Sequence, residues 1–281
     1  MEKDSSPSVV ACVPAWNAQD FIERTLISLA AQSYRNFRVL ISVDQSTDAT
    51  TEVCERFAAK DKRFEVLRQT RRLGWIGNVN ALLQRAESDY CVFAFHDDTL
   101  EPSFLSELAA ALKTNPTAVL AYSDMDISYL DGSLKKVSYC APDNVSDPGA
   151  RAQSIFRRED AWYVPHRGLF RTSIGKKIGG LRKHLAGEFS ADQPWLIHLS
   201  LYGEFVRVPK VLCHKHFMKG SLSLKWKYGP CHMSALGLAC ATEVLRAKVP
   251  LLLRLRVLSA FLIYGAKWLI FRRANLRKPA S

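Results

Sequence analysis

Short apolar stretches alternate with amphipathic stretches along the first part of the chain. The apolar stretches, rich in β-branched and aromatic residues, predict buried strands at residues 9–13, 39–43, 64–67 and 90–95. Apolar residues at helical spacing predict helices between them, at residues 21–30, 51–61 and 76–86. This alternation predicts an α/β fold with a doubly wound sheet flanked by helices. Such sheets bind their ligands at the carboxyl ends of the strands.

The second part of the chain has a less regular pattern. The elements expected there are a helix at 104–112, a strand at 119–123, a hairpin that turns at Asp131-Gly132, a surface loop at 141–151, a turn at 178–181, a helix ending near Leu201 and a strand at 206–212. A chain of 281 residues is long enough for one large domain. We divide it into a first half at 1–125, a second half of the same domain at 126–235 and a helical segment at 236–281.

Two adjacent carboxylates follow the apolar run at residues 90–95. Asp97 and Asp98 stand where that predicted strand ends, next to His96. Neighbouring carboxylates repel each other, so a bound cation is the explanation that we favour. Mg²⁺ and Mn²⁺ prefer oxygen ligands and take one or two protein carboxylates together with substrate phosphates. The alternative is a solvated turn in which Asp98 caps the helix that begins near Pro102.

Polar residues also follow the first two predicted strands. Asn17 and Asp44 can therefore converge with Asp97 and Asp98 at one edge of the sheet. Neither a GxGxxG fingerprint nor a GxxxxGK[ST] loop follows the first strand, which argues against the dinucleotide and P-loop sites that these motifs build.

Basic residues outnumber acidic ones, 39 against 27, for a formal charge of +12. Such a balance suits a phosphate-bearing substrate, an anionic membrane surface or nucleic acid. The basic residues are spread along the chain, so a nucleic-acid-binding protein is a less favoured alternative. Seven cysteines without a CxxC pair predict reduced thiols in a reducing compartment. The polar start of the chain predicts no signal peptide.

Apolar and basic residues mix between residues 244 and 273. The longest charge-free run, 257–266, is shorter than the roughly 20 residues that a membrane-spanning helix needs. Two interpretations stay open. Either an interfacial helix lies on anionic lipid, which places the protein in the cytoplasm on the inner face of a membrane, or the helix packs on the core with its basic residues outward. The residues concerned are Arg254, Arg256, Lys267, Trp268, Arg272 and Arg273.

Four motifs, taken in order, resemble those of family 2 glycosyltransferases. They are Val13-Pro14 with Asn17, Val43-Asp44 with Ser46-Thr47-Asp48, the segment from Gly74 to Asn80, and Asp97-Asp98 with Pro102. The resemblance covers about the first two-thirds of the chain. It implies the GT-A fold, a doubly wound mixed sheet flanked by helices, here followed by the basic and hydrophobic C-terminal helical extension.

The same resemblance implies a role for individual residues. Those that line the nucleotide pocket are Pro14, Asn17, Asp44, Arg72, Asn80 and His96, with Asp44 on the base, usually uracil. The metal ligands are Asp97, Asp98 and a late histidine, His216 or His214. Asp192 matches the general base, with Glu188 in reserve, although Asp192 can also be an N-cap before a helix with proline in its first turn.

One departure from the family pattern concerns the metal site. The first acid of the family's DxD element falls on Phe95, and His96 fills the middle position. His96 is then either a substitute ligand or hydrogen-bond donor, or an ordinary strand-end residue. A catalytically silent transferase stays open for this reason.

The resemblance implies transfer of a sugar from a nucleotide diphosphate sugar, UDP-linked, to a hydroxyl of a glycan or lipid-linked acceptor. A divalent cation, Mn²⁺ or Mg²⁺, assists, and a carboxylate base leads to inversion. The alternative enzyme is a nucleotidyltransferase with a similar sheet. The chain has Pro14-Ala15-Trp16-Asn17 where such enzymes carry a Gly-rich basic loop, which argues against that alternative. An anionic membrane surface is an expected partner, and nucleic acid is not.

Overall fold

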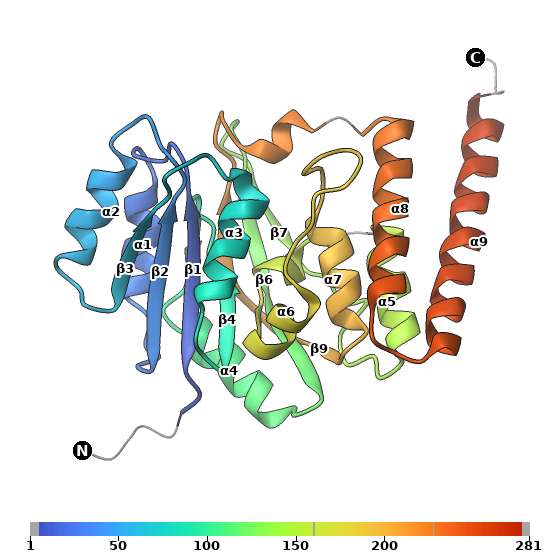
Figure 1. Ribbon diagram of the computed structural model, residues 1–281, viewed down its shortest axis with the longest axis horizontal. Coiled ribbons are helices and arrows are strands. Elements are labelled where there is room, and N and C mark those ends of the chain that lie inside the picture. Colours follow the sequence, from blue (N-terminus) through green and yellow to red (C-terminus); the bar gives the residue numbers. More distant parts are fainter. Residues whose placement is uncertain (1–5, 160, 227, 277–281) are drawn as a thin grey trace.

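The computed structural model describes residues 6–159, 161–226 and 228–276, with side chains up to Ala266. A nine-stranded sheet forms its centre (Figure 1), in the order β3-β2-β1-β4-β8-β6-β9-β5, with β7 beside β6. The strands are β1 (Val9–Ala15), β2 (Phe37–Val43), β3 (Phe64–Arg68), β4 (Tyr90–Phe93), β5 (Asp98–Leu100), β6 (Ala118–Ser128), β7 (Leu134–Val137), β8 (Leu169–Arg171) and β9 (Glu204–His216). The first four strands in sequence pair in parallel, whereas β8 runs antiparallel to both β4 and β6. The predicted doubly wound mixed sheet is therefore confirmed.

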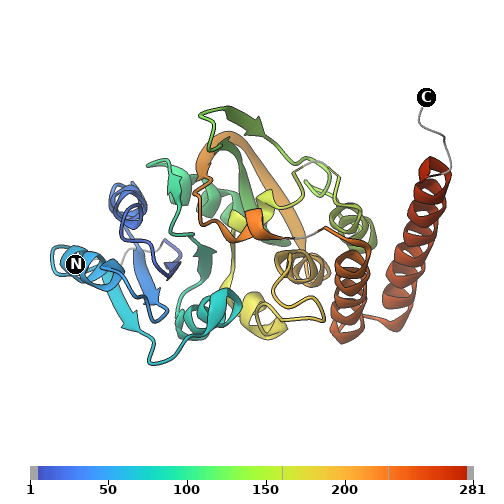
Figure 2. The ribbon, with the colours of Figure 1, turned by 90° about the horizontal axis from the view of Figure 1, so that it is seen from above.

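Helices cover both faces of the sheet. They are α1 (Ile22–Ala30), α2 (Thr50–Ala58), α3 (Gly74–Arg85), α4 (Phe104–Thr114), α5 (Pro148–Arg157), α6 (Thr172–Ile178), α7 (Asp192–Ser200), α8 (Pro230–Arg246) and α9 (Leu251–Leu276). Two short 3₁₀ helices, η1 (Val164–Arg167) and η2 (Leu222–Lys225), interrupt the connections. Figure 2 shows α3 and α6 on one face of the sheet and α1 and α4 on the other. Helix α1, for example, buries the apolar stripe of Ile22, Leu26 and Leu29.

The structure differs from the prediction at two helices of the second half, α5 and α6. The expected loop at 141–151 ends earlier, because α5 begins at Pro148, where the Asp147 carboxylate accepts a hydrogen bond from the Ala150 amide at 2.6 Å. The helix α6 was not predicted at all. It ends at the predicted turn, where Gly179 and Gly180 have φ angles of 84° and 70°. The hairpin between β6 and β7 turns at Asp131-Gly132 as predicted.

The two predicted halves share this one sheet, because β9 returns from the second half to pair with elements of the first. In its antiparallel pairing with β5, Asp98 lies opposite Lys215 and Thr99 lies opposite His214. This register brings the end of β9 to the carboxylates that follow β4. The sheet topology therefore assembles the site from segments more than a hundred residues apart.

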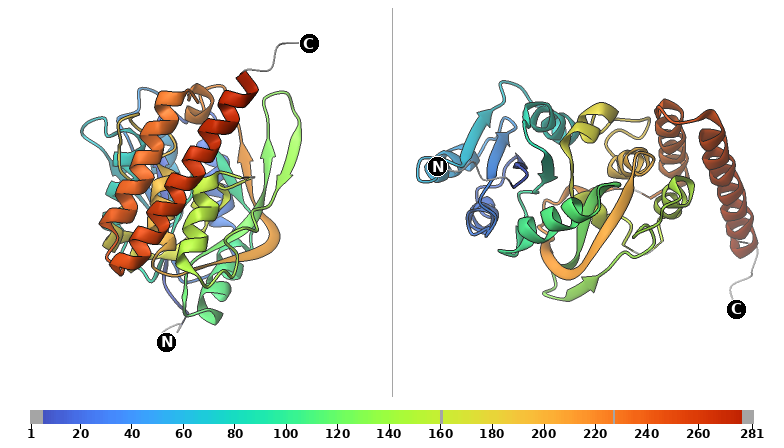
Figure 3. Two further views of the ribbon diagram at one scale, coloured as in Figure 1. Left: turned by 90° about the vertical axis from the view of Figure 1, so that its right-hand side faces the viewer. Right: turned by 90° about the horizontal axis from the view of Figure 1, so that it is seen from below.

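The last two helices, α8 and α9, run side by side at one end of the molecule (Figure 3), and α9 also packs against α5. Val257 and Phe261 of α9 are buried there, and the ring of Phe261 stacks on Phe156 with centroids 3.7 Å apart. One face of α9 is thus packed on the body, as the core interpretation expects, while the opposite face is exposed. The side chains of Lys267, Trp268, Arg272 and Arg273 lie outside the described part. Within the described residues, we find no helix apolar and long enough to cross a membrane.

Candidate active site

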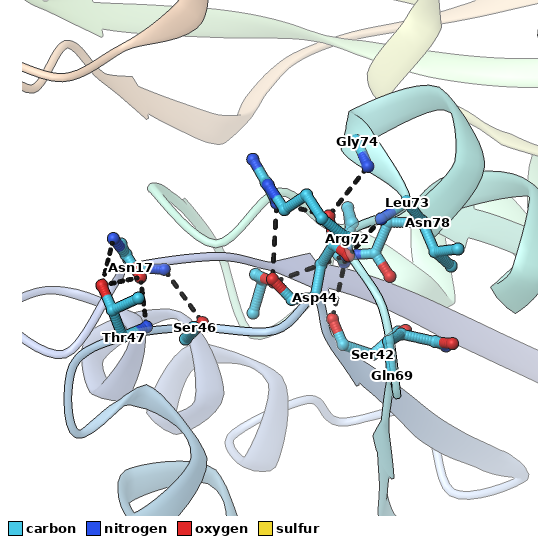
Figure 4. Close-up of polar contacts among 12 residues, drawn as sticks. Asn17, Ser42, Asp44, Ser46, Thr47, Gln69, Arg72, Leu73, Gly74 and Asn78 are labelled. Atoms are coloured by element: carbon cyan, nitrogen blue, oxygen red, sulfur yellow. Dashed lines mark hydrogen bonds and ion pairs between the residues drawn. The ribbon is translucent and has the colours of Figure 1, made fainter.

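Asp44 directly follows β2 and binds the start of α3 (Figure 4). Its buried carboxylate accepts hydrogen bonds from the Leu73 amide at 2.6 Å and the Gly74 amide at 3.0 Å, and it pairs with the Arg72 guanidinium. A carboxylate is favourable here because the first amides of a helix are unpaired and carry partial positive charge. Both oxygens of Asp44 are therefore engaged by the chain itself. The predicted contact of Asp44 with a nucleotide base would have to share or displace these bonds.

Arg72 lies between this carboxylate and an aromatic ring. Its guanidinium stands 3.8 Å from the ring centroid of Trp16, a cation–π distance, and 41% of Trp16 stays exposed. Arg72 was predicted for this pocket, whereas Trp16 was not. The signal available in the sequence was the position of Trp16 between the predicted pocket residues Pro14 and Asn17.

Hydrogen bonds join the loops that follow β1 and β2. The Asn17 side-chain oxygen accepts a hydrogen bond from the Thr47 amide at 2.9 Å, and the backbone amide of Asn17 donates to the Ser46 hydroxyl at 3.1 Å. Asn17 and Gln45 have φ angles of 44° and 40°, a left-handed conformation that is strained in residues other than glycine. The predicted residues Asn17 and Asp44 therefore lie on neighbouring loops at the carboxyl edge of the sheet.

Two further pocket predictions have different outcomes. His96 lies beside Pro14, with its ring Nδ1 2.7 Å from the Pro14 carbonyl oxygen. Asn80 faces elsewhere, since its side chain bonds both the amide and the carbonyl of Leu181, at 2.9 and 2.8 Å. Asn78 occupies the place expected for Asn80, because its amide donates to the Ser42 carbonyl at 3.0 Å, at the end of β2. Residues two apart on a helix point about 200° apart, so only one of the two asparagines can face the strand ends.

Asp97 and Asp98 have separate environments. Asp98 is buried, and one oxygen pairs with Arg167 Nε at 2.5 Å. Asp97 is partly exposed. Burial alone would raise its pKa, but Lys215, His96 and Arg167 outweigh that effect and lower the pKa of this carboxyl. Asp97 is therefore ionised at neutral pH, whereas the charge of Asp98 is already neutralised. The alternative that Asp98 caps the next helix is wrong, because Ser103 stands at the N-cap of α4.

The two predicted late histidines, His214 and His216, have different surroundings. His214 lies between two acids, 2.8 Å from Glu101 and 3.6 Å from Asp126. His216 has its Nε2 3.3 Å from the Thr99 hydroxyl, and burial together with Arg24 lowers its pKa, so the imidazole is neutral. A neutral imidazole is the form that binds metals.

The residues in this region fit a divalent cation only in part. In the described ranges, no three His, Cys, Asp or Glu side chains converge as a metal site. Asp97 and His216 are donors outside any ion pair, whereas Asp98 pairs with Arg167 through Oδ2 and its buried Oδ1 has no hydrogen-bond partner among the described residues. One ionised carboxylate is enough for a hard cation that takes its other ligands from substrate phosphates and water.

Asp192 is the first residue of α7 and is buried. Ala191 occupies the N-cap position without a side-chain bond, so the interpretation of Asp192 as an N-cap is wrong. Burial raises the pKa of this carboxyl, against the opposing charges of Arg158 and Arg167. Its Oδ2 lies 3.9 Å from His166 Nδ1, and its Oδ1 has no hydrogen-bond partner among the described residues. A buried carboxylate with a raised pKa and an unused oxygen can accept a proton at neutral pH.

His166 and Arg167 belong to this site and were not predicted. His166 is buried among the rings of Trp75, Phe93, Phe95 and Trp195, and this burial lowers its pKa well below the ordinary value. Arg167, directly after it, pairs with Asp98, and its charge acts on Asp97 and Asp192 as well. The dense polar and aromatic segment before β8 was the signal in the sequence. The pairings could not be derived from it, because they join η1 to three distant segments.

Glu188, the reserve candidate, lies against the start of α3. Its Oε1 would be 2.7 Å from a Cβ placed on Gly74, and Lys183 Nζ is 3.4 Å from the same oxygen. The structure thus places Glu188 near the Asp44 cluster and Asp192 near Arg167. The two acids are not equivalent candidates for one role.

The chain is similar in sequence to known proteins. Residues 10–174 match the sequence profile described as Glycosyl transferase family 2, which is more than half of the chain. A GalNAc(5)-diNAcBac-PP-undecaprenol beta-1,3-glucosyltransferase of Campylobacter jejuni is 30% identical over 199 residues, 70% of this chain and 60% of that protein. An uncharacterized glycosyltransferase of Haemophilus influenzae is 29% identical over 127 residues, 44% of this chain. The chain spans 39% of that relative's length and 20% and 14% of the lengths of two others.

Among solved structures, S. aureus TarS 1–349 in complex with UDP-GlcNAc has a similar fold. Its TM-score is 0.71 at 20% sequence identity, over 92% of this chain and 72% of that one. At this identity the likeness concerns the fold, and it agrees with the GT-A type expected from the motifs. The nucleotidyltransferase and nucleic-acid-binding alternatives gain no support from these comparisons.

Proposed function

This chain belongs to glycosyl transferase family 2, and we propose that it transfers a sugar from a nucleotide diphosphate sugar to a hydroxyl of a glycan or lipid-linked acceptor. The observation that carries the proposal is the contrast between two carboxylates. Asp97 is kept ionised by surrounding cations, whereas burial raises the pKa of Asp192. Carboxylates whose pKa values are pushed apart in this way commonly divide electrostatic and proton-transfer roles.

The donor that we propose is UDP-linked. The pocket for its nucleotide would be built by Asp44, Arg72 and the exposed ring of Trp16, at the carboxyl edge of the sheet. The complex of TarS with UDP-GlcNAc supports this choice, because that protein shares the fold over most of this chain.

Asp97 and His216 would hold a divalent cation, Mn²⁺ or Mg²⁺, when the donor is bound. Such a cation would neutralise the negative charge of the diphosphate leaving group. Asp98 would support the site indirectly, since its pairing with Arg167 places a fixed guanidinium beside Asp97. Arg167 would add positive charge on the same side as the leaving group.

Asp192 would act as the general base. It would take the proton of the acceptor hydroxyl while the acceptor oxygen forms a bond to the anomeric carbon. The bond from that carbon to the diphosphate would break, and the nucleoside diphosphate would leave with its electron pair. This single displacement, in which no side chain bonds to the sugar, would invert the configuration of the anomeric carbon. His166 lies 3.9 Å from Asp192, and its lowered pKa keeps it neutral. It would therefore form no ion pair with the Asp192 carboxylate, which could accept the proton.

The acceptor that we favour is lipid-linked. The Campylobacter relative acts, by its name, on an undecaprenol-linked glycan, which supports this choice. The enzyme would then work in the cytoplasm at the inner face of a membrane, where such a substrate can be reached.

A thermal-shift titration tests the proposal. Purified protein is heated with UDP, GDP, dTDP or CDP, each with and without Mn²⁺, and saturation at a hundred times the Kd would stabilise the native state by about 2.7 kcal/mol. We expect a shift with UDP that requires Mn²⁺ and is absent in Asp97→Asn. A protein that no nucleotide stabilises, with or without metal, would contradict the proposal.

A further inference from the structure

The helix α9 carries an apolar stripe that no described residue covers. Leu252 and Leu262 are 81% and 75% exposed. They belong to a row whose members recur every three or four residues and therefore share one face: Leu251, Leu252, Leu255, Ser259, Leu262, Ile263 and Ala266. Scattered exposed leucines are ordinary, but a continuous row on one helix indicates an interaction surface.

The stripe is held in place by the opposite face of the same helix. Val257 and Phe261 are buried against the body, and the Tyr264 hydroxyl donates to the Arg157 carbonyl at 3.2 Å. The exposed row thus lies on a helix whose other face packs on α5 and α8. Figure 3 shows α9 as the outer helix at this end of the molecule.

Polar groups along the stripe already have partners. The Ser259 hydroxyl donates to the Leu255 carbonyl at 2.8 Å within the helix. Arg256, the charged residue next to the row, pairs with Asp147 at 2.6 Å. An apolar environment could therefore cover this face without stranding an unpaired polar group.

The charge of the segment after Glu243 indicates what kind of surface the stripe binds. After Glu243 the chain contains nine Lys and Arg residues and no Asp or Glu. The residues up to Glu243 contain 30 basic and 27 acidic side chains, so most of the net charge of +12 belongs to this C-terminal segment. A leucine-rich helix face within a purely basic segment matches a surface that is both apolar and anionic.

We propose that α9 docks lengthwise on an anionic lipid bilayer, with its leucine stripe among the acyl chains and its basic residues at the headgroups. The stripe from Leu251 to Ala266 presents a contact roughly 24 Å long at the rise of an α-helix. A second copy of the chain is a poorer occupant, because pairing two such helices would bring like charges together. The proposal extends the proposed function by placing the enzyme where a lipid-linked acceptor lies. Its test needs neither donor nor acceptor, so the two proposals fail separately.

Co-sedimentation of the full chain with vesicles tests the inference. We expect binding to phosphatidylcholine vesicles that contain phosphatidylglycerol, little binding to phosphatidylcholine alone, and weakening at high salt. The variant L252S/L262S should bind at least about a hundredfold more weakly, because two leucine side chains no longer enter the lipid. The matched control L130S/L134S also removes two exposed leucines, from the hairpin, and should bind like the wild type.

Three results would overturn the inference. The first is equal binding by L252S/L262S and the control. The second is equal binding to both lipid compositions or to neither. The third is a dimer, seen by light scattering without lipid, that L252S/L262S converts to a monomer, since the stripe would then be an interface between copies. Unchanged circular dichroism and melting temperature of both variants verify that they fold.

Discussion

Adjacent Asp97 and Asp98 should lose very different amounts of stability on the same substitution to asparagine. Asp98 is buried and Arg167 is mostly buried, with 3% and 12% of their side chains exposed, and their ion pair measures 2.5 Å. Asp98→Asn removes the negative charge and leaves the mostly buried Arg167 guanidinium without its ion-pair partner. Breaking a buried pair in this way costs about 3–5 kcal/mol, and the remaining amide oxygen places this variant near the lower value. A loss of about 3 kcal/mol corresponds to a fall in Tm of roughly 6–12 °C.

Asp97→Asn should cost much less stability. Its carboxylate is partly exposed and makes no close ion pair with another described residue, so we expect a loss of about 1 kcal/mol or less. Because the pKa of Asp97 is lowered in the folded state, this contribution is present above the unfolded pKa and is lost as pH falls through the folded pKa. The variant should keep its fold and lose the stabilisation by UDP and Mn²⁺.

Thermal and urea denaturation of both variants at pH 7 distinguish the two roles. The single variant Arg167→Gln and the double variant Asp98→Asn/Arg167→Gln complete a double-mutant cycle. The double variant should recover part of the stability that Asp98→Asn loses, because it removes the unpaired positive charge. Equal melting temperatures for Asp97→Asn and Asp98→Asn would refute the reasoning. So would a double variant whose losses simply add.

Three further substitutions test other parts of the account. Asp192→Asn should lower kcat by about 10²–10⁴-fold. The pKa of Asp192 is raised in the folded state, so the wild type loses stability as pH rises through that pKa, whereas the variant does not. The Tm of the variant minus that of the wild type should therefore increase between pH 4 and pH 8, and a constant difference would contradict this. Gly180→Ala should destabilise by about 1–3 kcal/mol in urea denaturation, since the residue has φ of 70° and its Cβ would lie 2.2 Å from Asn80 Oδ1. Arg72→Ala should cost stability and weaken UDP binding in calorimetry, because it strands buried Asp44, and unchanged affinity would remove Arg72 from the pocket.

The first half of the fold could be predicted because its signals are local. Each strand is a short apolar run with a polar residue at its end, and the carboxyl edge of a parallel sheet collects those ends. Asn17, Asp44 and Asp97 were found in this way. The hairpin at Asp131-Gly132 was predictable for a similar reason, since the turn residues specify its geometry.

The remainder depends on contacts between distant segments. The insertion of β8 between β4 and β6 leaves no mark in the local pattern. The pairing of Asp98 with Arg167 spans 69 residues, and it changes the meaning of an adjacent-aspartate motif. The choice between Asn78 and Asn80 required the rotation of α3, which depends on packing. The start of α5 had a usable signal in Asp147-Pro148, which was outweighed by the loop-like composition around it.

Nucleotide release from a panel of nucleotide sugars, with a lipid-linked acceptor supplied, tests the central claim most directly. The account predicts that the wild type releases UDP from a UDP-sugar, that EDTA abolishes the release and Mn²⁺ restores it, and that Asp192→Asn stays folded with little release. Release of UDP by Asp192→Asn at the wild-type rate would contradict the assigned base. A folded wild type that releases no nucleotide from any donor in the panel would contradict the transferase itself.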